Sequence, residues 1–112
     1  MSKLTTHILD TSKGKPAADV SVYLYQQHND DWTEITIART NADGRIPGLL
    51  KEDVQLAAGI YKLKFMTREY FETQGMTSFY PFVEIVFEVS GTEHYHVPLL
   101  LNPYGYSTYR GS

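Results

Sequence analysis

Histidine and arginine side chains are the groups in this 112-residue chain that are best suited to chemistry. His7 lies in the middle of the segment Leu4–Asp10, on the face that it shares with Thr5 and Leu9. An imidazole with an unperturbed pKa of about 6.5 can act as a general base near neutral pH. A hydrogen-bonded histidine at a sheet surface is the alternative, and composition alone favours that alternative.

His94 and His96 form an H-x-H pair around Tyr95. On a strand the two imidazoles share a face, which suits metal binding. Carboxylate ligands are not obvious nearby, and the pair falls short of the three or four ligands that a zinc site uses. The sequence therefore favours a solvated His94 and a His96 that faces inward or towards an interface, with no metal and no cofactor. His28 lies in a polar turn and is expected to be ordinary surface.

The segment 41–45, Asn-Ala-Asp-Gly-Arg, is a tight-turn signal that projects Arg45. The planar guanidinium suits an oxyanion or a planar ring that bears carbonyls, and an ordinary surface arginine is the alternative. The chain ends in Tyr-Ser-Thr-Tyr-Arg-Gly-Ser, which is unusually aromatic for a frayed terminus. Because no G-x-S-x-G elbow is present, Ser112 is not a conventional hydrolase nucleophile.

The composition excludes several classes of function. The chain has 10 Lys and Arg against 13 Asp and Glu, a formal charge of −3, whereas a nucleic-acid-binding domain normally carries a basic excess. It has no Cys, which excludes disulfides, cysteine-zinc sites and thiol nucleophiles. No apolar run approaches the roughly 20 residues of a membrane span, and the N-terminal segment holds no apolar signal. We therefore expect a soluble, cytoplasmic protein that has no nucleic-acid or membrane partner.

Turn signals divide the chain into short segments of alternating polarity, which predict strands. The predicted strands are Leu4–Asp10, Val20–Tyr25, Trp32–Arg39, Gly59–Met66, Val83–Val89, Tyr95–Leu101 and Tyr104–Arg110. Thr67 offers a helix cap and Gly75 a stop, so one short helix is expected near residues 68–75. Residues 1–112 thus predict a single all-β domain, a two-sheet β-sandwich of about seven or eight strands.

The run Leu99–Leu101 does not alternate, so both faces of its strand favour burial. A two-layer sandwich covers only one face of a strand with its own core. The other face is therefore expected to meet a second subunit. A local irregularity near Pro103 is the alternative.

Four stretches together resemble the transthyretin-related family, in its enzyme branch, the 5-hydroxyisourate hydrolases. The resemblance covers essentially the whole chain. The closing Tyr-Arg-Gly-Ser is the hallmark of the enzyme branch, and the hormone-carrier branch lacks it. The four stretches are Leu4–Thr11 with Gly14–Ala17, Thr40–Arg45, Gly59–Leu63 and Tyr95–Ser112.

The resemblance implies hydrolysis of 5-hydroxyisourate to 2-oxo-4-hydroxy-4-carboxy-5-ureidoimidazoline in urate and purine degradation. It implies a transthyretin-like homotetramer, a dimer of dimers, whose sites lie at subunit interfaces. Water would attack the ring amide with help from a histidine, while Arg45 stabilises the developing negative charge. The catalytic residues implied are His7, Arg45, His96 and Ser112. The substrate-binding residues implied are His7, Arg45, Tyr109, Arg110 and Gly111.

Two other functions compete with this one. A carrier of a small aromatic ligand, as in the transthyretin branch proper, would use the central channel that the resemblance implies between the subunits of the tetramer. Such a carrier would not need the two histidines. An adhesion or interaction module is compatible with a β-sandwich, because this architecture hosts many functions. Such a module would leave the polar residues unexplained.

Overall fold

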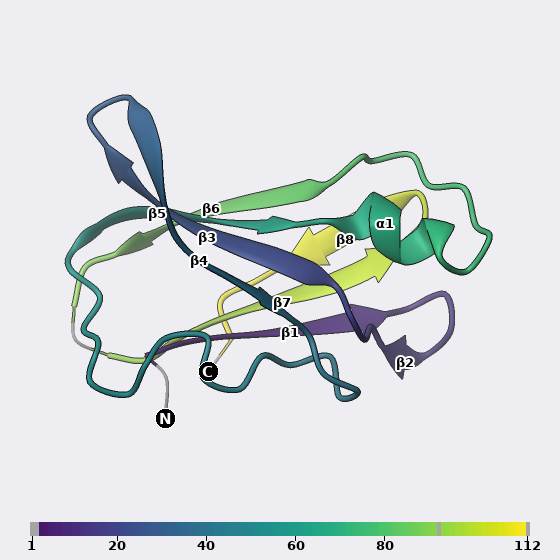
Figure 1. Ribbon diagram of the computed structural model, residues 1–112, viewed down its shortest axis with the longest axis horizontal. Coiled ribbons are helices and arrows are strands. Elements are labelled where there is room, and N and C mark those ends of the chain that lie inside the picture. The colour runs from purple at the N-terminus through teal and green to yellow at the C-terminus, as the bar shows by residue number, and fades with distance from the viewer. Residues whose placement is uncertain (1–2, 92, 112) are drawn as a thin grey trace.

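The computed structural model describes residues 3–91 and 93–111, and it is a sandwich of two sheets with one short helix at one end (Figure 1). The elements in chain order are β1 (Leu4–Asp10), β2 (Lys15–Pro16), β3 (Ser21–His28), β4 (Asp31–Arg39), β5 (Gly59–Phe65), α1 (Thr67–Glu72), β6 (Val83–Val89), β7 (Tyr95–Asn102) and β8 (Gly105–Thr108).

Each sheet has four strands. The first sheet has the order β2-β1-β7-β8 and the second has the order β4-β3-β5-β6. All neighbouring strands are antiparallel except β1 and β7, which are parallel and begin with Leu4 opposite Tyr95. This pairing joins the two ends of the chain, because β1 is the first strand and β7 is the seventh.

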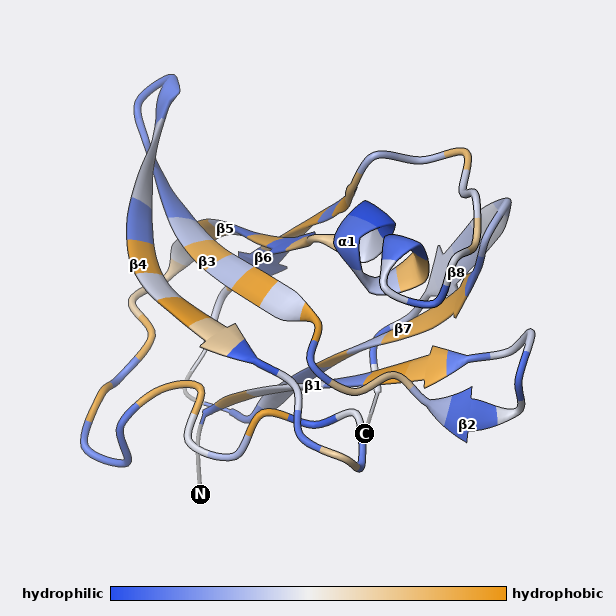
Figure 2. Ribbon diagram, turned by 45° about the vertical axis from the view of Figure 1, so that its right-hand side comes forward, coloured by the Kyte–Doolittle hydropathy of each residue, from blue (hydrophilic) through white to orange (hydrophobic). Residues whose placement is uncertain are grey.

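The core lies between the two sheets and is built mainly from alternate residues of β1, β3, β5, β6 and β7. Ile8 and Leu99 from the first sheet pack towards Leu24 and Leu63 from the second, and all four are fully buried. The alternating hydropathy along β3 is visible as bands in Figure 2. Since the core uses one face of each sheet, the other faces of both sheets point outward.

The structure confirms the all-β sandwich and most of the predicted strands. β1 and β6 have the predicted bounds. The two-residue strand β2 was missed, because its Lys15 and Pro16 belong to a segment that reads as a turn. β8 ends at Thr108, two residues earlier than predicted.

The short helix is confirmed, but its predicted N-terminal cap is wrong. α1 begins at Thr67 itself, Met66 occupies the N-cap position, and no side chain accepts a capping hydrogen bond there. The helix also ends at Glu72, because the backbone N–H groups of Gln74 and Met76 both donate to the Phe71 carbonyl. Gly75 follows at φ 70°, a left-handed conformation that suits glycine. Within the described residues, no helix has the length and apolar character needed to span a membrane.

Candidate active site

The pairing of β1 with β7 brings the two predicted catalytic histidines to one face. Thr5 lies opposite His96 in the parallel register, and His7 lies two residues further along β1. Thr6, the one residue between Thr5 and His7 on β1, is buried on the core side of the sheet. Both histidines therefore lie on the outer face of the first sheet, where each is half-buried.

The turn that precedes Arg45 is held tightly against β1. The side-chain oxygen of Asn41 accepts hydrogen bonds from the backbone N–H groups of Asp43 (2.9 Å) and Arg45 (3.1 Å). The carbonyl of Gly44 accepts a hydrogen bond from the N–H of Ile8 at 2.9 Å. Gly44 has φ 73°, and a Cβ at this position would overlap the carbonyl oxygen of Ile8. Glycine is thus required here by both conformation and space, and it places Arg45 beside His7 in an antiparallel bridge.

The C-terminal tail closes the other side of the site. After β8 the chain turns back, and the N–H of Gly111 donates to the carbonyl of His96 at 2.8 Å. The guanidinium of Arg110 points elsewhere: it pairs with Glu93 at 3.0 Å and lies 4.9 Å from the centre of the Tyr95 ring. Ser112, the last predicted catalytic residue, lies outside the described residues.

These elements surround a hollow of about 580 Å³ on the outer face of the first sheet. Five of the predicted site residues line it, and Arg110 does not. Two further residues, Thr5 and His94, also line it and were not predicted. The H-x-H spacing was the sequence signal that could have placed His94 in the site. Thr5 gave no such signal, because its proximity to His96 depends on the pairing of β1 with β7. The lining residues are Thr5, His7, Arg45, His94, His96, Tyr109 and Gly111.

Burial and charge keep both inner histidines neutral near pH 7. The pKa of His7 is lowered from 6.5, mainly by burial and then by the positive charge of Arg45. The pKa of His96 is lowered by burial, by Arg45, and by the neighbouring His94 and His7. A neutral imidazole keeps one nitrogen lone pair, so each ring is able to accept a proton from water.

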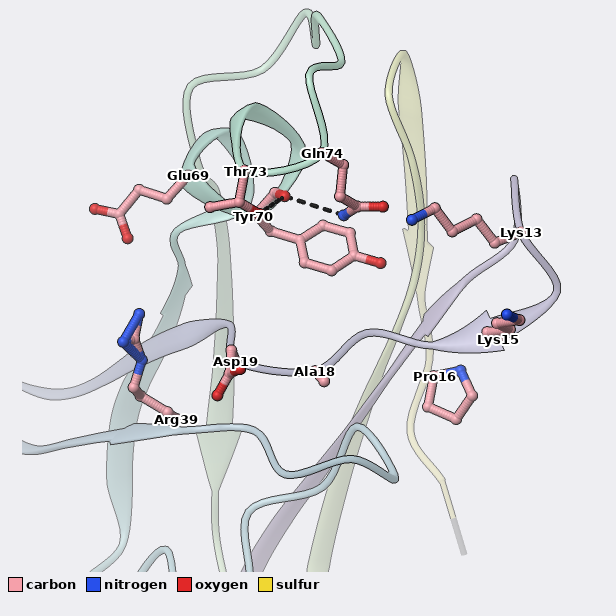
Figure 3. A pocket seen from close by; sticks show the side chains of 10 residues that line it. All are labelled: Lys13, Lys15, Pro16, Ala18, Asp19, Arg39, Glu69, Tyr70, Thr73 and Gln74. Atoms are coloured by element: carbon pink, nitrogen blue, oxygen red, sulfur yellow. Dashed lines mark hydrogen bonds between the residues drawn. The ribbon is translucent and has the colours of Figure 1, made fainter.

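A second hollow, of about 630 Å³, lies between α1 and the segment that contains β2 (Figure 3). The Tyr70 ring lies across it, and the Tyr70 hydroxyl donates to the buried carboxylate of Asp10 at 2.7 Å. None of the predicted site residues lines this hollow, and it offers no histidine. Its lining residues are Lys13, Lys15, Pro16, Ala18, Asp19, Arg39, Glu69, Tyr70, Thr73 and Gln74.

The arrangement on the first sheet suits hydrolysis of a polar ring. Two neutral imidazoles are proton acceptors, and the guanidinium of Arg45 offers fixed donors for an oxygen that becomes negative. In the part of the chain that the structure describes, no group of three His, Cys, Asp or Glu side chains could hold a metal ion.

Fold and site together define a β-sandwich protein with a hollow lined by histidines and an arginine on the outer face of one sheet. The chain belongs to the HIUase/Transthyretin family, which it matches over residues 4–111.

Relatives from both branches of this family are similar to the chain. A curated 5-hydroxyisourate hydrolase of Salmonella dublin is 48% identical over 110 residues, covering 97% of this chain and 80% of the relative. The solved 5-hydroxyisourate hydrolase of Klebsiella pneumoniae is 38% identical with a TM-score of 0.85, covering 97% of this chain and 92% of the other. A sea bream transthyretin solved in complex with thyroxine is also 38% identical, with a TM-score of 0.92 and coverage of 98% and 95%. Both branches share this fold, so the fold does not distinguish an enzyme from a carrier. That distinction depends on the residues of the site.

Proposed function

We propose that this protein hydrolyses 5-hydroxyisourate, opening its ring amide to give 2-oxo-4-hydroxy-4-carboxy-5-ureidoimidazoline in urate degradation. The observation that carries the proposal is the convergence of His7, His96 and Arg45 on one hollow from three separate segments of the chain. The 48% identity with a curated hydrolase, over nearly the whole chain, supports the same activity.

The proposed reaction begins when a histidine accepts a proton from water as the water oxygen attacks the ring carbonyl. The carbonyl oxygen becomes negative, and the guanidinium of Arg45 stabilises it. Fixed donors of this kind contribute about 10²–10³-fold to the rate of such reactions. When the carbon–nitrogen bond breaks, the ring nitrogen takes the proton that the histidine accepted from water and leaves as a neutral ureido group, while the carboxylic acid that forms loses its proton to solvent.

The tail contributes shape to the proposed substrate site. Tyr109 lines the hollow, and Gly111 holds the end of the chain against the backbone of His96. Substrate contacts from Arg110 would need its exposed ion pair with Glu93 to exchange for a contact in the hollow. Exposed pairs of this type are worth about 0–1 kcal/mol, so such an exchange costs little.

We also propose that the protein assembles as a homotetramer with its sites at subunit interfaces. β6 and β8 each have one strand neighbour in the described chain, so the other edge of each is open to a second copy. Large apolar groups near these edges are exposed, among them Val86 (57%) and Tyr106 (42%). Sedimentation equilibrium tests the assembly, and a fully active monomer would contradict it.

The activity is tested by adding the protein to 5-hydroxyisourate freshly made from urate by urate oxidase. Ultraviolet absorbance follows its decay. We expect a decay rate that is proportional to protein concentration and well above the uncatalysed rate. The second candidate is a carrier of the transthyretin type, which the TM-score of 0.92 with the sea bream transthyretin favours. A carrier would bind an aromatic ligand such as thyroxine and leave the decay rate unchanged.

A further inference from the structure

The hollow between α1 and the segment that contains β2 has an aromatic wall that is fixed in place (Figure 3). The hydroxyl of Tyr70 donates to Asp10 at 2.7 Å. The carboxylate of Asp10 is fully buried, and it also accepts hydrogen bonds from the N–H and the hydroxyl of Ser12. The Tyr70 ring packs edge-on against the buried Phe71, with ring centres 5.1 Å apart. A flat ring that stacks on Tyr70 thus meets a side chain that is already ordered, so little conformational freedom is lost on binding.

Gln74 gives this hollow a buried acceptor that the protein itself does not use. The Nε2 atom of Gln74 donates to the carbonyl of Tyr70 at 3.0 Å, and the opposite orientation of the amide would bring two oxygens together. The amide oxygen, Oε1, is buried and has no hydrogen-bond partner among the described residues. Buried polar atoms in proteins are nearly always paired. The position therefore suits an N–H group that a ligand supplies.

Positive charge gathers at the hydroxyl end of the Tyr70 ring. Lys15 lies opposite Asp10 in the pairing of β1 with β2, and the N–H of Lys13 donates to the carbonyl of Asp10 at 3.2 Å. Both lysines therefore leave the backbone close to the carboxylate that holds Tyr70. Both line the hollow and are exposed, and neither forms an ion pair in the part of the chain that the structure describes. Two unpaired ammonium groups attract an anionic group to this end.

The opposite end of the hollow carries both signs of charge. The N–H of Asp19 donates to the carbonyl of Thr40 at 2.9 Å, which brings Asp19 close to Arg39. Glu69 of α1 lies on the same side of the Tyr70 ring (Figure 3). A carboxylate accepts a hydrogen bond from an N–H, whereas a guanidinium donates to a carbonyl oxygen. Neighbouring N–H and C=O groups, as in a cyclic urea or amide, match this end.

We propose that this hollow is a second binding site, for a planar, anionic nitrogen heterocycle with N–H and C=O groups along its edges, the class of the oxidised purines. The ring stacks on Tyr70, its anionic edge lies between Lys13 and Lys15, and a ring N–H donates to Oε1 of Gln74. The volume of about 630 Å³ is within the usual range of small-molecule sites, and no lining residue is shared with the hollow on the first sheet. Burial raises the pKa of Tyr70 to about 12, so the phenol is neutral and does not repel an anion.

Urate is the probe that tests this site, because it is a planar monoanion near neutral pH and carries both N–H and C=O groups. Caffeine is the matched control ligand: it has the same ring system, but it is neutral and has no N–H. The ¹⁵N-labelled protein is titrated with each ligand. We expect urate to shift the side-chain amide signals of Gln74 and the backbone signals of Lys13 and Lys15 to saturation, and caffeine to shift them weakly.

Two outcomes of the titration overturn the proposal. Urate shifts that are confined to the hollow on the first sheet show that the second site does not bind it. Equal affinity for caffeine and urate shows that neither the charge nor the N–H groups are recognised. Inorganic phosphate tests the lysines alone, and its displacement of urate at an equal concentration overturns the role of the ring.

Variants assign the affinity to particular side chains, with the Lys15 backbone signal as the readout. Lys13→Gln should weaken urate binding about fivefold, the upper range for one exposed ion pair. Gln74→Met, which keeps the length of the side chain and removes the acceptor, should weaken it about tenfold. Lys51→Gln is the matched control, because Lys51 is exposed and does not line the hollow. Unchanged affinity in both Lys13→Gln and Gln74→Met overturns the site. Failure of the protein to hydrolyse 5-hydroxyisourate would refute the proposed function, and the titration would still decide the second site.

Discussion

Replacing Gly111 with alanine is expected to disable the site and leave the sandwich folded. Gly111 packs directly on His96, and its N–H donates to the His96 carbonyl at 2.8 Å. A Cβ added here would lie 3.1 Å from Cγ and 3.3 Å from Cβ of His96, and would overlap Cδ2 of the ring. Either the imidazole must turn away or the tail must lift from β7.

The size of the effect follows from the displacement. Removing the overlap requires a movement of about 1 Å, and a misplacement of that size costs about 10²-fold in rate. We therefore expect kcat for 5-hydroxyisourate to fall about 10²-fold in Gly111→Ala. Gly105→Ala is the matched control, because a Cβ there lies 3.7 Å from the Asn102 side chain, an ordinary contact. It should keep wild-type activity.

The assay compares decay of freshly made substrate with each variant, after circular dichroism has confirmed that both fold. The core does not include Gly111, so both variants should melt near the wild-type temperature. Wild-type turnover by Gly111→Ala would refute the close packing of the tail on His96. Equal losses in both glycine variants would show that the tail, rather than this contact, is sensitive to any added side chain.

Three further predictions concern charge and burial. The pH–rate profile should have an acid limb with a midpoint below pH 6.5 and should be flat from pH 7 to 8. The lowered pKa values of His7 and His96 keep both rings neutral in that range. A midpoint above pH 7 would contradict this prediction. Arg45→Gln should lower kcat by about 10²–10³-fold and move that limb to higher pH, since the charge of Arg45 contributes to both lowered pKa values. Tyr70→Phe should lower the free energy of unfolding by about 1–3 kcal/mol in urea denaturation and leave kcat unchanged, because it removes a hydrogen bond to the fully buried carboxylate of Asp10.

The imidazole rings of His7 and His96 also make the stability of the fold depend on pH. The unfolded chain binds protons on His7 and His96 with a pKa near 6.5, whereas the folded chain binds them less readily. Stability from these two groups is therefore complete above pH 6.5 and is lost as the pH falls below it.

Local sequence pattern was sufficient for most of the strands, although not for β2, and for the turn that carries Arg45. Alternation located β1 and β6, and the Asn-Ala-Asp-Gly signal located the turn, because both depend on neighbours along the chain. The first turn of α1 was misjudged, since Thr67 is buried within the helix instead of capping it.

Contacts between segments that are distant in the chain could not be predicted from local sequence pattern. Thr5 and His96 are 91 residues apart in the chain, and only the parallel pairing of β1 with β7 brings them together. The sequence favoured a solvated His94, which is exposed as expected but also bonds to Thr5. The ion pair of Arg110 with Glu93 likewise depends on how the tail returns after β8, which no local pattern specifies.

The central claim is that histidines in the hollow on the first sheet activate water for hydrolysis of 5-hydroxyisourate. It is tested most directly by the decay rate of fresh substrate with His7→Asn and His96→Asn, with His28→Asn as control because His28 is exposed at the end of β3. We expect at least one of the first two variants to lose about 10²–10⁴-fold in rate, the range for general acid–base catalysis, while the control stays at the wild-type rate. Rates near wild type in both His7→Asn and His96→Asn would contradict the claim.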